Sequence, residues 1–235
     1  LPSWKRVDTS VNGSSRAPNL GINFDVQRDV RDVVAVAHNS ELYVGWIESV
    51  GKSPGRTSNW CARVARYNGD DSKPDWKFVD GGGAGGINLS ATNESGNISL
   101  ASFGGALFAS WQEYGGSRKS ASDKVRVRSF NSTTGVWSWE DGGSNGLNII
   151  PGNNAGHPVL VATDTKLYVG FNQYNGTGTD IRVKVYQGGS NWNLADGGGV
   201  YSVNPLTVLH SGVSVGAGVC LGWGTVDPYG VQVSC

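Results

Sequence analysis

Three arginines recur at one equivalent position of the chain and are the first residues that suggest a chemistry. Arg63, Arg126 and Arg182 open the segments RVARY, RVRSF and RVKVY. Three converging guanidinium groups would bind a sugar carboxylate. Equivalent positions of a repeat lie about one repeat apart, however, and this segment is the third strand of its unit, away from a common axis. We therefore expect each arginine to form an ion pair inside its own repeat.

The expected partners stand two residues after the aromatic residue that ends LYVGW, LFASW or LYVGF, at Glu48, Glu113 and Gln173. Loops that follow these positions carry an aromatic residue beside glycines, which suits sugar recognition because a ring stacks on the C–H face while polar groups bind hydroxyls. Ordinary exposed loop residues are the alternative. The residues predicted to bind a ligand are Glu48, Trp60, Arg63, Asn88, Glu113, Tyr114, Arg126, Asn148, Gln173, Tyr174 and Arg182.

Motifs for catalysis or metal binding fail on their context, so we assign no catalytic residue and no cofactor. The segment GVSVG matches a nucleophile elbow, but no helix follows it. The three histidines fall in different repeats without the spacing of metal ligands. Asp25, Asp29 and Asp32 form an acidic cluster with two arginines. A Ca²⁺ site and a solvated charged loop are both compatible with that cluster.

The elements that must position these residues belong to a repeat. A Trp followed four residues later by Asp occurs four times, at Trp4/Asp8, Trp76/Asp80, Trp137/Asp141 and Trp192/Asp196. The last three copies continue as DGG and reach an Asn seven or eight residues beyond the Asp. We expect each Asp carboxylate to accept backbone N–H bonds in the glycine turn, and each Trp to pack between units.

Each copy supplies four short strands with glycine turns and no apolar period of 3.6 residues, which predicts an all-β fold. The last copy stops at Cys235 without its Trp strand, and the missing strand stands at the other end, in residues 3–8. We predict a single domain, a four-bladed β-propeller of four-stranded blades. Its blades span about 30–80, 97–141, 157–197 and 205–235, and residues 3–8 close the last blade as its outer strand.

These W-x3-DGG and LYVGW-x-E patterns resemble the repeats of secreted bacterial and fungal β-propellers, including propeller lectins. The resemblance implies a non-catalytic lectin with several sites that bind glycans or glycoproteins. Two alternatives stay open. One is an enzyme that acts on a polysaccharide or glycoside through carboxylates near the axis. The other is a structural or protein-binding propeller with an ion in its channel.

Composition and charge bear on the remaining classes of function and on the location of the protein. The formal net charge of zero argues against nucleic-acid binding, and no apolar run approaches the length of a membrane span. The start at Leu1-Pro2 indicates a processed, secreted product. Six glycosylation sequons predict a glycoprotein, and Cys220 and Cys235, placed opposite each other when Thr225 faces Gly230, predict a disulfide. Association into a homo-oligomer stays open.

Overall fold

The computed structural model describes most of the chain as β-strands joined by turns. The described residues are 5–17, 21–51, 59–115, 122–196, 202–203, 208–215, 218–226 and 229–234. Within these ranges there is no helix, and hence no helix that could cross a membrane. The prediction of an all-β fold is confirmed.

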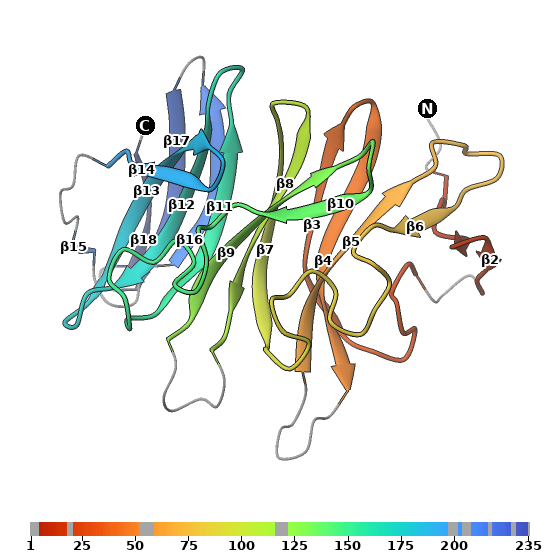
Figure 1. Cartoon of the computed structure of the whole chain (residues 1–235), viewed down its shortest axis with the longest axis horizontal. Coiled ribbons are helices and arrows are strands. Elements are labelled where there is room, and N and C mark those ends of the chain that lie inside the picture. Colours follow the sequence, from red (N-terminus) through yellow and green to blue (C-terminus); the bar gives the residue numbers. More distant parts are fainter. Residues whose placement is uncertain are drawn as a thin grey trace.

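Four sheets follow one another along the chain (Figure 1). The first contains β1 (Ser10–Val11), β2 (Ser14–Ser15), β3 (Val30–His38), β4 (Glu41–Gly51), β5 (Asn59–Tyr67) and β6 (Trp76–Phe78). The second contains β7 (Ser95–Phe103), β8 (Ala106–Glu113), β9 (Lys124–Asn131) and β10 (Val136–Trp139). The third contains β11 (Ala155–Ala162), β12 (Leu167–Tyr174), β13 (Thr179–Gly188), β14 (Asn191–Leu194) and β15 (Ser202–Val203). The fourth contains β16 (Val208–Val215), β17 (Gly218–Val226) and β18 (Tyr229–Ser234).

Consecutive sheets pack face to face, and the apolar runs of the repeat supply the core. Successive side chains of a strand point to opposite faces of its sheet. A strand whose sheet lies between two other sheets is therefore buried on both faces. Strand β8 shows this, because it is buried at every position from Leu107 to Glu113. One cluster of buried side chains joins the first and second sheets around Tyr43 and Trp111, and another joins the second and third sheets around Phe108 and Phe171. Each such side chain contributes about 1.5–3 kcal/mol.

Glycines of the DGG segment allow the chain to cross from one sheet to the next. Gly86 has φ of +53°, and Gly146, at the equivalent place, has φ of +57°. A Cβ atom at either position would overlap a backbone carbonyl oxygen, of Ala62 or Val125 respectively. The residue after each glycine donates its N–H to that same carbonyl, at 3.0 Å from Ile87 and 2.9 Å from Leu147. The close approach therefore requires glycine.

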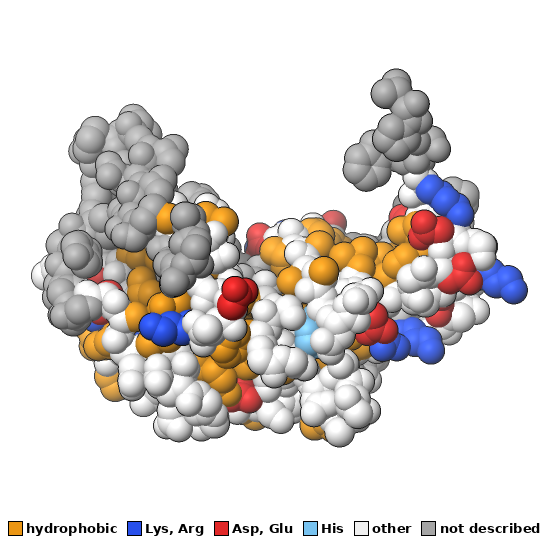
Figure 2. All heavy atoms as spheres, turned by 90° about the horizontal axis from the view of Figure 1, so that it is seen from above, with side chains coloured by type: hydrophobic (Ala, Val, Ile, Leu, Met, Phe, Trp, Pro, Cys, Tyr) orange, Lys and Arg blue, Asp and Glu red, His pale blue; other side chains and the backbone are white. Residues whose placement is uncertain are grey.

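The predicted closure of the ring is wrong in this structure. Residues 5–8 do not lie beside β18, because the N-terminal segment is held on the first sheet. Val11 of β1 pairs in parallel with Trp76 of β6, whose indole nitrogen donates a hydrogen bond of 3.0 Å to Val7 O. Strands β2 and β18 consequently lie at opposite ends of the molecule (Figure 1). The sheets form an open arc, hollowed on one side (Figure 2), and Ser3 and Trp4 lie outside the described residues.

The register predicted for the last hairpin is found. Thr225 faces Gly230 across β17 and β18, and Leu221 faces Ser234. Cys235 lies outside the described residues, so its disulfide with Cys220 stays a prediction. Cys61 is a free, buried thiol on β5, and burial raises its pKa to about 12.

Candidate functional site

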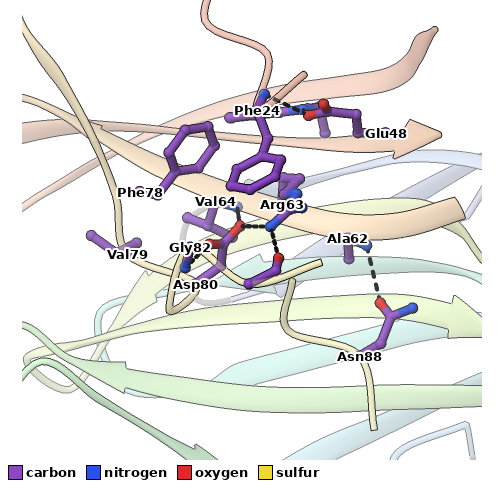
Figure 3. Close-up of polar contacts among 12 residues, drawn as sticks. Phe24, Glu48, Ala62, Arg63, Val64, Phe78, Val79, Asp80, Gly82 and Asn88 are labelled. Carbon is purple, nitrogen blue, oxygen red and sulfur yellow. Dashed lines mark hydrogen bonds and ion pairs between the residues drawn. The ribbon is translucent and has the colours of Figure 1, made fainter. Parts of the chain in front are cut away.

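Each repeated arginine forms a buried ion pair with the aspartate of its own DGG segment. Arg63 Nη1 lies 3.3 Å from Asp80 Oδ2, and both side chains are 0% exposed (Figure 3). The equivalent distances are 2.9 Å between Arg126 and Asp141 and 2.6 Å between Arg182 and Asp196. These pairs join the third strand of each of the first three sheets to the turn that leaves its fourth strand.

The prediction of an ion pair within each repeat is confirmed, but its acidic partner was wrongly assigned. Glu48 lies opposite Cys61, two residues from the position of Arg63, which lies opposite Trp46. The DGG aspartate reaches the arginine because its turn folds back over the third strand. Asp80 also accepts the N–H of Gly82 at 2.9 Å, as expected for this turn. Burial raises the pKa of Asp80, while the charge of Arg63 opposes that rise.

The acidic or amide residues of the second strand hold the loops that precede the first strands, within the first sheet for Glu48 and between sheets for Glu113 and Gln173. Glu48 accepts the backbone N–H groups of Phe24 and Asp25 at 2.9 and 2.7 Å. Glu113 accepts the N–H of Leu89 at 3.0 Å, and Gln173 Oε1 accepts that of Ile149 at 2.8 Å. All three residues that accept these bonds are buried.

The repeated asparagines have a similar role. Asn88 Oδ1 accepts the N–H of Ala62 at 3.0 Å (Figure 3), and Asn148 Oδ1 accepts that of Val125 at 3.2 Å. Their side-chain nitrogens donate to carbonyls five residues ahead, at Asn93 and Asn153. The asparagines thus fix the loop after each glycine crossing. Ligand binding by these residues and by the arginines stays a prediction, and the contacts observed for them lie within the protein.

Of the three predicted aromatic residues, Trp60 and Tyr114 lie near one arginine and Tyr174 does not. The guanidinium carbon of Arg31, on β3, is 4.2 Å from the centre of the Trp60 ring. Its Nη2 donates to Ser95 O at 3.1 Å. A Cβ added at Gly96 would lie 3.3 Å from Tyr114 Oη and 3.6 Å from Arg31 Nη2, so the hydroxyl and the guanidinium both border this glycine. Tyr174 belongs to the next sheet and is 42% exposed.

A row of polar residues that the sequence analysis missed runs beside Arg31. Strands β3, β7 and β11 are the first strands of their sheets, and neighbouring first strands contact one another. Each has a break in register that contains one non-glycine residue of positive φ: Asp32 at 54°, Asn97 at 54° and His157 at 51°. Such bulges turn a side chain out of the regular alternation of its strand. Asp32 Oδ2 accepts the N–H of Asn97 at 2.8 Å, which links two strands of the row.

This row had a signal in the sequence. A polar residue stands at the start of each apolar first-strand segment, as in DVVAV, NISLA and HPVLV. The fourth copy has His210 at a register shift of β16, between Leu209 and Ser211. The residue type changes from copy to copy, so a search for identical residues does not detect the position.

Three carboxyl groups and one guanidinium group influence the pKa of the Tyr114 hydroxyl. Burial raises the pKa of Tyr114, and the negative charges of Asp123, Glu94 and Asp32 raise it further against the opposing charge of Arg31. Asp123 precedes β9 and accepts a hydrogen bond of 3.1 Å from Gln112 Nε2. Burial raises the pKa of Asp123. The Asp32 side chain is 33% exposed.

We call this group the first-strand cluster; its members are Arg31, Asp32, Trp60, Gln112, Tyr114, Asp123 and His157. Gln112 connects two of them, because its Oε1 also accepts the N–H of His157 at 3.4 Å. A half-buried carboxyl with a raised pKa is suited to donate a proton, and an exposed carboxylate is suited to act as a base or a nucleophile. An aromatic ring and an arginine beside them suit a polyhydroxylated substrate.

The calcium alternative gains no support from the described residues, where no three His, Cys, Asp or Glu side chains are placed to hold a metal ion. Asp25 pairs with Arg28 at 3.0 Å, and Asp32 lies 3.8 Å from Arg31 Nε. These contacts describe a charged loop and a strand rather than an ion cage.

Comparisons with known proteins relate the fold to glycoside hydrolases. No protein-family model and no curated protein sequence matches the chain. Zg3597, a family 117 glycoside hydrolase of the marine bacterium Zobellia galactanivorans, has a TM-score of 0.54 and 10% identity over 88% of this chain and 69% of its own. The α-L-arabinanase of Penicillium chrysogenum has 0.54 and 15% over 86% and 61%. A glycosyl hydrolase of Bacteroides ovatus has 0.51 and 12% over 84% and 60%.

At these identities the likeness is one of fold: the four sheets are arranged as in β-propeller glycoside hydrolases, and the number of blades is not confirmed as four. The chain spans less than two thirds of the length of two of these three proteins. The comparisons correct the preference for a non-catalytic lectin, because the solved structures that resemble the chain are enzymes that act on glycosides. They favour the glycoside-acting alternative.

Proposed function

We propose that this protein hydrolyses glycosidic bonds with the first-strand cluster as its active site. The observation that carries the proposal is the placement of two carboxyl groups near the Tyr114 hydroxyl: Asp123 accepts a hydrogen bond of 3.1 Å from Gln112 Nε2, and Asp32 accepts the N–H of Asn97 at 2.8 Å, next to the glycine that this hydroxyl borders. One, Asp123, is half-buried and has a raised pKa, and the other, Asp32, is partly exposed. Glycosidases use such a pair, one carboxyl as the acid and the other as base or nucleophile.

In this reaction the Asp123 carboxyl donates its proton to the oxygen of the departing sugar as the glycosidic bond breaks. The Asp32 carboxylate promotes attack on the anomeric carbon, directly or by taking a proton from the attacking water. Water is consumed, and both carboxyl groups return to their starting states. Gln112 positions Asp123 through its 3.1 Å hydrogen bond.

Recognition of the sugar falls to the neighbouring side chains. The Trp60 ring offers an apolar face, and Arg31 and Tyr114 offer hydrogen-bond donors beside it. The fold of the solved glycoside hydrolases supports carbohydrate as the substrate class. A secreted location, which would agree with a polysaccharide substrate, is part of this proposal.

The test measures hydrolysis of polysaccharides and aryl glycosides by the full chain and by three variants. Asp123→Asn is expected to lose about 10²–10⁴-fold in rate on unactivated glycosides and much less on dinitrophenyl glycosides, whose leaving group needs no proton. Asp32→Asn should lose rate on both classes. Asp164→Asn, at an exposed turn position, is the control and should retain full rate. A panel without turnover, or Asp32→Asn and Asp123→Asn variants that keep the full rate, would refute the proposal.

A further inference from the structure

Two glycines leave room for polar side chains of the preceding sheet. Gly96 of β7 and Gly156 of β11 each stand directly before the residue of positive φ in their strand. A Cβ atom added at Gly96 would lie 3.3 Å from Tyr114 Oη and 3.6 Å from Arg31 Nη2, whereas one added at Gly156 would lie 2.2 Å from Gln112 Oε1. The distances at Gly96 are contacts, and the distance at Gly156 is an overlap. The position of the Gln112 side chain therefore requires glycine at 156.

An alanine at position 156 would displace the Gln112 amide rather than the backbone. The three atoms nearest to the added Cβ would be Gln112 Oε1, Cδ and Nε2, at 2.2, 2.4 and 2.9 Å, and all three belong to the end of one flexible side chain. The φ angle of Gly156 lies outside the left-handed region, so alanine can adopt it. What this glycine preserves is consequently the place of one amide group.

The His157 N–H determines which way the Gln112 amide points. This N–H lies 3.4 Å from Gln112 Oε1, and only the carbonyl end of an amide can accept it. The amide nitrogen then faces Asp123 and donates to Oδ2 at 3.1 Å. Gln112 is buried, so the reversed amide would set two donors against each other at His157 away from water. The amide therefore has one orientation.

The main chain of Asp123 is fixed by the loop that leads into β11 and by β11 itself. Its carbonyl oxygen accepts the N–H of Ala155 at 3.0 Å and Asn148 Nδ2 at 2.8 Å. Its N–H donates to Asn154 Oδ1 at 3.0 Å. With the main chain held by these three bonds, the carboxyl group can still rotate about its side-chain bonds. The Gln112 amide restricts that rotation.

We propose that Gly156 and Gln112 are positioning residues, which hold the Asp123 carboxyl with Oδ2 as hydrogen-bond acceptor and the transferable proton on Oδ1. A protonated carboxyl carries hydrogen on one oxygen, and Oδ2 already accepts from Gln112 Nε2. The proton given to the departing sugar thus leaves from Oδ1, and the carboxylate that remains keeps its bond to Gln112. The inference rests on the proposed function for the use of this proton.

The electrostatics of Asp123 give this arrangement a measurable consequence. Burial raises the pKa of Asp123, and the hydrogen bond from Gln112 lowers it, because the donated N–H stabilises the carboxylate. Loss of the Gln112 bond should therefore raise this pKa further. The other titratable or charged side chains of the first-strand cluster are Arg31, Asp32, Tyr114 and His157. The pKa of Tyr114 is raised above 10.0, so its hydroxyl stays neutral while a carboxyl titrates.

The first test follows the Asp123 carboxyl by ¹³C NMR in the full chain labelled at aspartate, with Asp123→Asn to assign the resonance. Gln112→Met keeps the size of the side chain without its hydrogen bond, and Gly156→Ala displaces the amide. Asp123 should titrate at higher pH in both variants than in the wild type. Gly83→Ala adds a Cβ with nothing within 4 Å, Gln187→Met changes an exposed side chain, and both should titrate as the wild type. Wild-type titration in Gln112→Met and Gly156→Ala would overturn the proposal.

Kinetics separate the positioning role from the proposed function. On unactivated glycosides Gln112→Met and Gly156→Ala should each lower kcat/KM about 10–100-fold and move the alkaline limb of its pH profile to higher pH. Dinitrophenyl glycosides, whose leaving group needs no proton, should be hydrolysed at close to the wild-type rate. The double variant should lose no more than Gln112→Met alone, because both changes remove the same bond.

The two ways in which these measurements can fail are distinct. A wild type without turnover would refute the proposed function, and the NMR titration then decides the positioning of Asp123 by itself. A wild type with turnover whose Gln112→Met and Gly156→Ala variants keep its rate and pH profile would overturn the positioning role and leave the proposed function standing.

Discussion

The indole nitrogen of Trp137 donates a 2.7 Å hydrogen bond to the carbonyl oxygen of Val79, which belongs to the preceding sheet. The bond crosses between sheets at the level of their fourth strands. Because the bond joins two sheets, it stabilises the stacking of repeats rather than a single sheet.

Removal of this bond should weaken the protein measurably. Trp137→Phe keeps an aromatic ring against Phe130 but leaves Val79 O without its donor, which should lower the free energy of unfolding by about 1–3 kcal/mol. Urea denaturation measures the change. Val136→Ala, at the exposed neighbouring position, is the control and should change it by no more than about 0.5 kcal/mol. Equal effects would show that the indole bond contributes nothing.

Breaking a buried ion pair should cost more than breaking an exposed one. Asp80→Asn leaves the buried Arg63 guanidinium without its counter-charge, and the expected loss is about 3–5 kcal/mol. Glu41→Gln breaks the pair with Arg66, which is about one-third exposed, and should cost at most about 1 kcal/mol. Denaturant titration of both variants tests the ranking, and a reversed order would contradict it.

The carboxyl group of Asp123 should make stability depend on pH in a defined direction. Its pKa is raised in the folded state above the ordinary value of 3.8, so the folded protein binds its proton more tightly than the unfolded chain. The resulting stabilisation is present below pH 3.8 and is lost as pH rises through the folded-state pKa. The wild type should therefore lose stability relative to Asp123→Asn between acid and neutral pH.

Parallel unfolding curves of these two proteins at several pH values provide the measurement. Asp164→Asn serves as the control, because that aspartate is exposed. A difference between wild type and Asp123→Asn that stays constant, or that changes in the opposite direction, would show that the raised pKa is absent.

Substitution of the glycine at the crossing between sheets should lower the free energy of unfolding more than substitution of another glycine with a similar positive φ. Gly86→Ala adds a Cβ that overlaps Ala62 O, whereas Gly69→Ala, at φ of +75°, adds one into open space. Both variants strain the backbone, so their difference isolates the steric effect. We expect the free energy of unfolding of Gly86→Ala to be lower than that of Gly69→Ala by about 1–3 kcal/mol, measured by thermal or urea unfolding. Equal losses of stability in the two variants would show that backbone strain, and not the overlap with Ala62 O, accounts for the whole effect.

The sequence predicted β3 to β14 and β16 to β18 in their order, because glycine turns and alternating apolar residues are local signals, but it placed residues 3–8 in the last sheet and did not predict β1, β2 or β15. It also predicted the pairing of Thr225 with Gly230 from the turn alone. The partner of Arg63 was wrong because a turn that folds back over a sheet brings Asp80 closer than any cross-strand residue. The bulge that presents Asp32 was missed because register breaks depend on the packing of neighbouring strands rather than on local composition.

The sequence also did not predict the burial of the repeated polar residues, because burial depends on how the sheets stack and not on local composition. Glu113 and Asn88 have the composition of binding-loop residues, but stacking of the sheets encloses them and turns their oxygens toward backbone N–H groups. Trp60 and Tyr114 retain a place near a candidate site, because both lie beside Arg31.

The bonds from Trp76, Trp137 and Trp192 all end on main-chain oxygen, and the acceptor residues are two valines and one glutamate. Any amino acid offers that oxygen, so only the donor needs to be a particular residue. A duplicated repeat that keeps its tryptophan can therefore form this hydrogen bond with any neighbouring repeat, whatever residue stands at the acceptor position. The sequences of the two repeats can then diverge without loss of the bond. Gene duplication can lengthen such an array without the compensating mutation that a side-chain-to-side-chain contact would require.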